Sequence, residues 1–120
     1  MMLPRTYEGQ TCSIARALEI VGERWTLLLL RDALLGVRRF EDFRAGLGIP
    51  RNVLAVRLDL LLKAGLLRQE PYSTHPVRHE YVPTERAVDV WPVLVALGRW
   101  GARHGDPPGL AGEFAQGSRG

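Results

Sequence analysis

The residues best suited to chemistry in this chain of 120 residues stand at the start of a leucine-rich segment. Arg51 and Asn52 follow Pro50, and Ala55 and Val56 lie one helical turn further on. Arg pairs bidentately with guanine and Asn with adenine, while small apolar side chains contact the thymine methyl group. These residue types indicate base recognition in double-stranded DNA. An ordinary solvated helix start is the alternative interpretation.

Four further basic residues lie in two other short segments. Arg38 and Arg39 precede the amphipathic stretch Phe40–Leu47. His75 and Arg78 lie further along the chain, in the polar stretch after Glu70. Side chains of this kind bind backbone phosphates, which position a protein on DNA without reading its sequence. Arg78 is also suited to a narrow minor groove. For His75 and Arg78 an ordinary polar loop is an equally good interpretation.

The inventory of catalytic and metal-binding patterns argues against an enzyme. The single cysteine, Cys12, excludes an internal disulfide and a multi-cysteine zinc site, and it fits a reducing compartment. There is no glycine-rich phosphate loop and no His-Glu-x-x-His. His75 and His79 lack the cysteine or carboxylate that would complete a zinc site. We therefore expect no catalytic residues, no metal and no cofactor.

Composition and charge indicate a globular, DNA-compatible protein without excluding other partners. The chain is 46% hydrophobic, and 16 basic residues against 13 acidic ones give a net charge of +3. So modest a charge leaves open a protein-interaction module that makes no base-specific contact with DNA. The apolar stretch Trp25–Leu35 is too short to span a membrane, and residues 1–10 lack the apolar core of a secretory signal. We expect a cytoplasmic protein with no membrane partner.

The apolar periodicity predicts the elements that must position these residues. Helices are expected over Cys12–Val21, Arg24–Leu35, Phe40–Leu47, Pro50–Ala64 and Thr84–Arg103, the last kinked near Val88–Pro92. Two extended segments, Leu66–Glu70 and Arg78–Val82, predict a β-hairpin whose loop is longer than a tight turn. The expected fold is mainly α with a small β-hairpin, a winged helix-turn-helix domain over residues 1–104 followed by a flexible tail over 105–120.

The helical wheel of the segment that starts at Pro50 divides it into two faces. Leu54, Leu58, Leu61 and Leu62 fall on one side, and Asn52, Ala55, Asp59 and Lys63 on the other. Asp59 and Lys63 are spaced to form an ion pair at i and i+4. Arg57 points toward the apolar side, where a cation needs a partner. We expect Asp32 or Asp42 to provide it.

An ordered series of motifs between Cys12 and Arg103 resembles the HxlR family of bacterial transcription regulators, which are related to the MarR type. The matching stretches are Cys12–Leu18, Gly22–Thr26, Gly36–Phe40, Gly48–Ile49, Val53–Leu54, Arg57–Leu58, the Arg-x-Glu-Tyr-x-x-Thr run Arg78–Thr84, Trp91–Leu94 and Trp100–Gly101. Three positions depart from the pattern. Pro50 and Ala55 stand where the family commonly has Ser or Thr, and Ala87 stands where glycine is usual.

The resemblance implies a homodimer that is built from the first and last helices and binds an inverted repeat near promoters, most often as a repressor. The residues expected at the dimer interface, where an apolar seam can also hold a small-molecule effector, are Ile14, Leu18, Trp91, Leu94, Leu97 and Trp100. Cys12 matches a cysteine with which some members sense electrophiles or oxidants. A silent thiol at the interface is the alternative.

Overall fold

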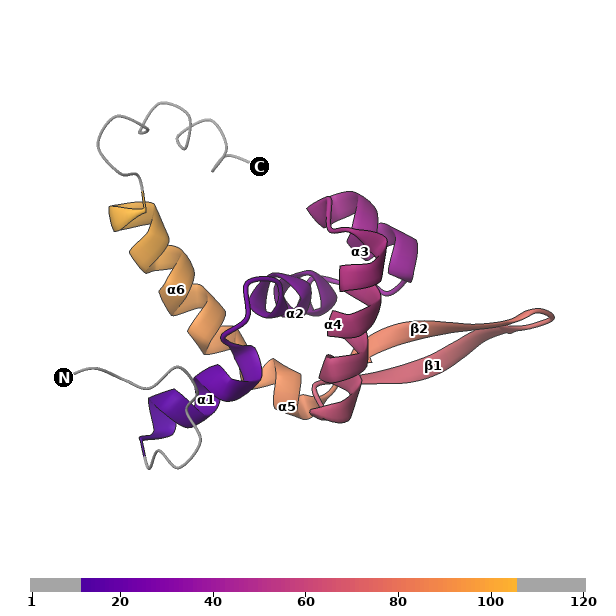
Figure 1. The fold of residues 1–120 in the computed structure, drawn as a ribbon, viewed down its shortest axis with the longest axis horizontal. Coiled ribbons are helices and arrows are strands. Elements are labelled where there is room, and N and C mark those ends of the chain that lie inside the picture. Colours follow the sequence, from indigo (N-terminus) through magenta and orange to yellow (C-terminus); the bar gives the residue numbers. More distant parts are fainter. Residues whose placement is uncertain (1–11, 106–120) are drawn as a thin grey trace. The chain divides into compact units, whose positions relative to one another are not determined.

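The structure is a computed structural model that describes residues 12–105 (Figure 1). Six helices and one β-hairpin follow one another in the order α1 (Ser13–Val21), α2 (Thr26–Leu34), α3 (Phe40–Leu47), α4 (Arg51–Lys63), β1 (Leu67–Thr74), β2 (Val77–Pro83), α5 (Glu85–Val88) and α6 (Trp91–His104). This is the winged helix-turn-helix arrangement expected from the sequence, mainly α with one small hairpin. The flexible tail expected over residues 105–120 lies outside the described residues except for Gly105.

The chain divides between Asp89 and Val90 into two compact units. The first holds α1–α5 with the hairpin, and the second holds α6. The expectation of one domain over residues 1–104 therefore stays a prediction, and the two units are described separately below.

All the buried apolar side chains of the described residues belong to the first unit. They come from every helix of that unit and from the start of the hairpin: Ala15, Leu29, Leu30, Ala33, Phe43, Ile49, Leu54, Leu58, Leu61, Leu66, Leu67 and Ala87. Each fully buried leucine of this kind contributes about 1.5–3 kcal/mol relative to an exposed one. This core fixes the position of α4 within the unit.

The hairpin differs from its prediction in length and in its turn. β1 and β2 pair antiparallel from Leu67–Pro83 outward to Thr74–Val77, so that only His75 and Pro76 connect them. The sequence predicted shorter strands with a long loop, because Pro71 reads as a strand breaker. A two-stranded sheet has free edges, where proline is tolerated. The register also shifts between Pro71 and Ser73, which lets the ladder continue.

The last expected helix is two helices. α5 ends at Val88, and α6 begins at Trp91 with Pro92 in its first turn. Proline has no N–H, and its ring clashes with the carbonyl four residues earlier, which here is that of Val88. Proline at the start of a helix costs nothing of this kind. The expected kink is therefore a full break, and the Thr84 side chain caps the N-terminus of α5.

Candidate nucleic-acid interface

The two faces predicted for α4 are present in the structure. Leu54, Leu58 and Leu61 are buried, and Leu62 is half-buried. Arg51, Asn52, Ala55 and Val56 are all exposed, and Val56 keeps 54% of its surface accessible although it is apolar. The Val56 side chain is therefore accessible to an apolar contact with a partner. The expected base-reading residues thus share one accessible face, while their contact with DNA stays a prediction.

The turn between α3 and α4 determines the direction in which α4 starts. Gly48 adopts a left-handed backbone with φ of 66°, and its N–H donates to the carbonyl of Arg44 at 2.9 Å. The next residue, Ile49, is buried and anchors the turn in the core. Pro50 then precedes α4 without a side-chain cap, as expected from its lack of a hydroxyl group. Glycine is favoured in the left-handed conformation of residue 48 because it has no Cβ.

Arg51 forms an ion pair that sequence reasoning missed. Its Nη2 lies 2.6 Å from Oε1 of Glu41, in the first turn of α3, and its guanidinium lies 5.4 Å from the centre of the Phe40 ring. Oε2 of Glu41 is 3.7 Å from Nη1 of Arg44. Glu41 and Arg51 are ten positions apart in the sequence, so no local spacing rule predicts the pair. Only the packing of α3 against α4 brings the two together.

Arg39 joins the hairpin to the loop before α3. Its Nε lies 3.5 Å from Oε2 of Glu80 on β2, and its guanidinium lies 4.1 Å from the centre of the Tyr72 ring on β1. Arginine over an aromatic face is stabilised by the ring quadrupole. No signal in the sequence indicates either partner of Arg39, because both lie on the hairpin, more than 30 positions away. The Arg39 side chain remains exposed and can still contact a phosphate.

Arg38 has a clear structural role beside its predicted contact with phosphate. Its Nη1 donates to the carbonyl of Ala33 at 2.6 Å and to that of Val37 at 3.1 Å. Its own carbonyl accepts from the N–H of Tyr81 at 2.7 Å and so ties the loop to β2. Arg38 therefore stabilises the junction between α2 and the hairpin, and its part in DNA binding stays a prediction.

His75 and Arg78 lie in the outer half of the hairpin, which projects from the helices as a narrow arm (Figure 1). Both side chains are exposed, and within residues 12–105 Arg78 has no ion-pair partner. Arg78 is thus a free cation on the arm. The structure brings the predicted residues together as two groups, one on α4 and one on the hairpin and the loop before α3, both in the first unit.

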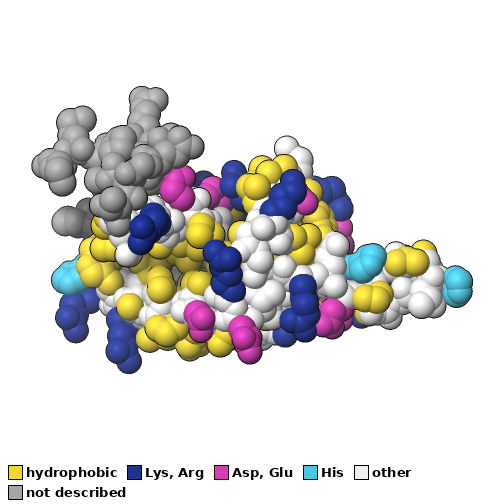
Figure 2. All heavy atoms as spheres, turned by 90° about the horizontal axis from the view of Figure 1, so that it is seen from below, with side chains coloured by type: hydrophobic (Ala, Val, Ile, Leu, Met, Phe, Trp, Pro, Cys, Tyr) yellow, Lys and Arg dark blue, Asp and Glu magenta, His cyan; other side chains and the backbone are white. Residues whose placement is uncertain are grey.

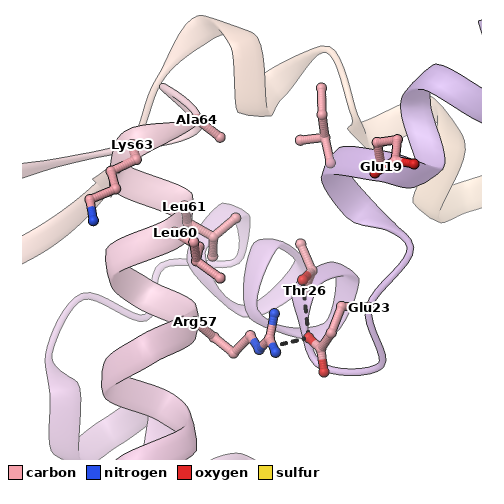
Figure 3. A pocket seen from close by; sticks show the side chains of 9 residues that line it. Glu19, Glu23, Thr26, Arg57, Leu60, Leu61, Lys63 and Ala64 are labelled. Atoms are coloured by element: carbon pink, nitrogen blue, oxygen red, sulfur yellow. Dashed lines mark hydrogen bonds and ion pairs between the residues drawn. The ribbon is translucent and has the colours of Figure 1, made fainter. Parts of the chain in front are cut away.

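Arg57 is half-buried, as expected, but its partner is different. Its Nε lies 3.4 Å from Oε2 of Glu23, and this oxygen also accepts from the Trp25 N–H and the Thr26 hydroxyl (Figure 3). Asp32, one of the two expected partners, pairs with Arg31 instead. The Glu23 side chain therefore connects α4 to the start of α2. These groups line a cavity of about 350 Å³ between α1, α2 and α4.

Cys12 is an exposed, free thiol immediately before α1. The backbone N–H of Ala15, followed by that of Ile14, lowers the pKa of the Cys12 thiol below its ordinary value, and Arg16 adds a weaker attraction. Both N–H groups belong to the first turn of α1, so the start of this helix stabilises the thiolate. A lowered thiol pKa favours the reactive thiolate form.

The residues expected at a dimer interface are mostly accessible. Ile14 and Leu18 of α1 are exposed, and on α6 the exposed set includes Trp91, Leu97 and Trp100, while Leu94 is half-buried. No residue of α6 is buried. The expected effector would bind this seam, and that also stays a prediction. Within residues 12–105 no helix has the length and apolar character that a bilayer crossing requires.

Comparison with known proteins gives a family and a fold. Residues 20–108 match the HxlR-like helix-turn-helix family. An uncharacterized HTH-type transcriptional regulator of Mycobacterium tuberculosis is 50% identical over 99 residues, which are 82% of this chain and 61% of the relative. The chain thus spans about three fifths of that relative's length.

Two solved structures have the same fold. PA1374 of Pseudomonas aeruginosa, described as a candidate transcription factor, is 52% identical, with a TM-score of 0.61 over 78% of this chain and 64% of its own. The redox regulator HypR in its reduced form is 26% identical, with a TM-score of 0.73 over 79% and 95%. The family consists of regulators, which confirms the prediction that the protein is not an enzyme. The chain belongs to the HxlR-like helix-turn-helix family.

Proposed function

We propose that this protein is a sequence-specific regulator of transcription that binds double-stranded DNA as a homodimer on a palindromic operator. The observation that carries the proposal is the exposed face of α4, on which Arg51, Asn52, Ala55 and Val56 stand opposite the buried leucines. Placed in the major groove, this face offers a guanine reader, an adenine reader and two apolar contacts for thymine. The hairpin carries Arg78 toward the DNA backbone or the minor groove.

The exposed apolar side chains of α6 support the dimer. Val93, Leu97 and Trp100 are spaced along one side of the helix and are more than half exposed. Apolar surface of this extent in a folded chain indicates a protein partner, and a second copy supplies an identical surface. Two α4 helices about 34 Å apart in such a dimer would enter successive major grooves. Repression is the mode that we propose, because a bound dimer occupies DNA that the polymerase needs.

Salt-dependent binding to DNA tests this function. Fragments selected from a random-sequence pool by the protein are expected to contain an inverted repeat, and their affinity is expected to fall steeply with salt as counterions are released. Leu97→Glu is expected to halve the molecular mass in solution and to abolish selection of the repeat. Binding that ignores both sequence and salt would favour the alternative, a module that binds another protein.

A response to oxidants or electrophiles is a second, finer proposal, and it rests on Cys12. The thiol is exposed and its pKa is lowered. HypR, a structural relative, is itself a redox regulator. Alkylation of Cys12 is expected to change operator affinity, and Cys12→Ser is expected to be insensitive to the reagent. Unchanged affinity after complete alkylation would leave Cys12 as a silent thiol.

A further inference from the structure

The start of α4 has an acidic neighbour that base recognition does not by itself require. Arg51 is the first residue of α4, where a positive side chain adds to the positive end of the helix dipole. Neither a side-chain cap nor an acid in the first turn of α4 offsets this charge. Glu41 supplies a carboxylate from α3, 2.6 Å from the Arg51 guanidinium. The negative charge that α4 lacks at its N-terminus therefore comes from the neighbouring helix.

This contact also restricts the Arg51 side chain. The carboxylate of Glu41 holds one edge of the guanidinium, and the Phe40 ring lies 5.4 Å away. Guanidinium has five N–H donors, so a bond from Nη2 to Glu41 leaves donors for a base. A side chain that is ordered before binding loses less conformational entropy in the complex. The geometry thus prepares Arg51 for one orientation.

The same carboxylate acts against contacts with phosphate. On the face seen in Figure 2, basic and acidic side chains lie beside one another next to the hairpin. A phosphate that approaches Arg51 meets the charge of Glu41, which has 59% of its side chain exposed. Binding to unrelated DNA depends on phosphate contacts, whereas binding to an operator adds contacts with base edges. A carboxylate here therefore weakens non-specific binding more than specific binding.

We propose that Glu41 is a specificity-determining residue, which orients Arg51 toward a base edge and penalises complexes that use only phosphate. It widens the ratio between the affinities for the operator and for unrelated DNA. The inference rests on the proposed DNA-binding function. It assigns a role in that function to Glu41, an acidic residue of α3 whose own charge repels DNA.

Glu41→Gln tests the proposal through that affinity ratio. The variant and the wild type are titrated with a selected fragment and with a scrambled fragment of the same length, at several salt concentrations. We expect tighter binding of the scrambled fragment and a ratio lower by about two- to fivefold, the range that exposed ion pairs reach. Asp59→Asn is the matched control, because it removes an equal charge from an exposed pair with Lys63 at the far end of α4. Its ratio is expected to stay unchanged.

The double variant with Arg51→Ala separates positioning from plain repulsion. In the Arg51→Ala background, Glu41→Gln is expected to change the ratio less, because the repulsion of phosphate remains but there is no guanidinium left to orient. An effect as large as in the wild-type background would overturn the positioning role, and an unchanged or higher ratio in Glu41→Gln alone would overturn the proposal. Unfolding midpoints verify that all variants fold. A wild-type protein that binds neither fragment would instead overturn the proposed function.

Discussion

The central helices α2, α3 and α4 and the terminal helices α1 and α6 differ in how far they bury their apolar side chains. α2, α3 and α4 each bury apolar side chains completely, and Leu29, Leu30, Phe43 and Leu54 have no exposed surface. α1 buries only Ala15, and α6 buries nothing. Both terminal helices are amphipathic, so their exposed faces are a property of the sequence. The difference indicates which part of the fold is complete within one chain.

The largest expected effect comes from matched leucine truncations in the two regions. Leu54→Ala in α4 is expected to lower the free energy of unfolding by about 2–5 kcal/mol, because it leaves a cavity in a closed core. Leu97→Ala in α6 removes a side chain that is 51% exposed and leaves no such cavity within the chain. Denaturant titrations at several protein concentrations measure both effects.

In these titrations the two losses are also expected to depend differently on concentration. The loss from Leu97→Ala is expected to shrink as the protein is diluted, because it acts through association. The loss from Leu54→Ala is expected to be independent of concentration. Equal and constant losses for the two variants would mean that the surface of α6 is already covered within one chain, and the comparison between the regions would fail.

A smaller effect is expected when the accessible side of α4 is changed instead of its buried side. Arg51→Ala is expected to weaken binding to a selected fragment by about 1–3 kcal/mol if the side chain reads guanine. It is expected to leave the free energy of unfolding nearly unchanged, since the lost ion pair with Glu41 is exposed to solvent. Lys63→Ala, at the other end of α4, is the control. Equal losses on selected and unrelated fragments would make Arg51 a phosphate contact.

The sequence predicts those features of the structure that depend on interactions between residues close together in the chain. The bounds of α3 and the two faces of α4 are correct, because apolar periodicity within one helix determines them. The Asp59–Lys63 pair is also correct, since it is local. The sequence could not identify Glu23 as the partner of Arg57. That pair depends on how α4 packs against the turn before α2.

The candidate site shows the same division. The exposure of Arg51, Asn52 and Ala55 follows from the helical wheel, whereas the acid that holds Arg51 lies on α3 and requires the turn geometry. The length of the hairpin was misjudged because a proline inside a strand usually ends it, and the register shift beside Pro71 offsets this rule. Local periodicity is therefore readable from one sequence, and contacts between elements are not.

A third effect, a loss of about 1 kcal/mol in the free energy of unfolding, is expected from Thr84→Ala at the start of α5. The Thr84 hydroxyl donates to the carbonyl of Gly65 at 2.6 Å and accepts from the Ala87 N–H at 3.4 Å, and thus joins the start of α5 to the end of α4. Thr84→Ala removes both bonds, and Thr84→Ser retains them. Thermal unfolding of the two variants measures the difference. Equal midpoints would show that the hydroxyl contributes nothing to closing this region.

The smallest expected effect concerns Cys12, which precedes the exposed terminal helix α1. It is measured as the pH dependence of thiol alkylation and not as a free energy of unfolding. Because neighbouring N–H groups lower the pKa of this thiol, its thiolate forms at lower pH in the folded protein than in the unfolded chain. The pH at which alkylation by iodoacetamide reaches half its maximal rate is therefore expected to be lower in buffer than in concentrated urea. Arg16→Gln is expected to raise this midpoint only slightly, since Arg16 is the weakest of the contributing causes. Identical midpoints in buffer and urea would mean that the start of α1 does not act on the sulfur, and the terminal helix would then offer only an apolar surface.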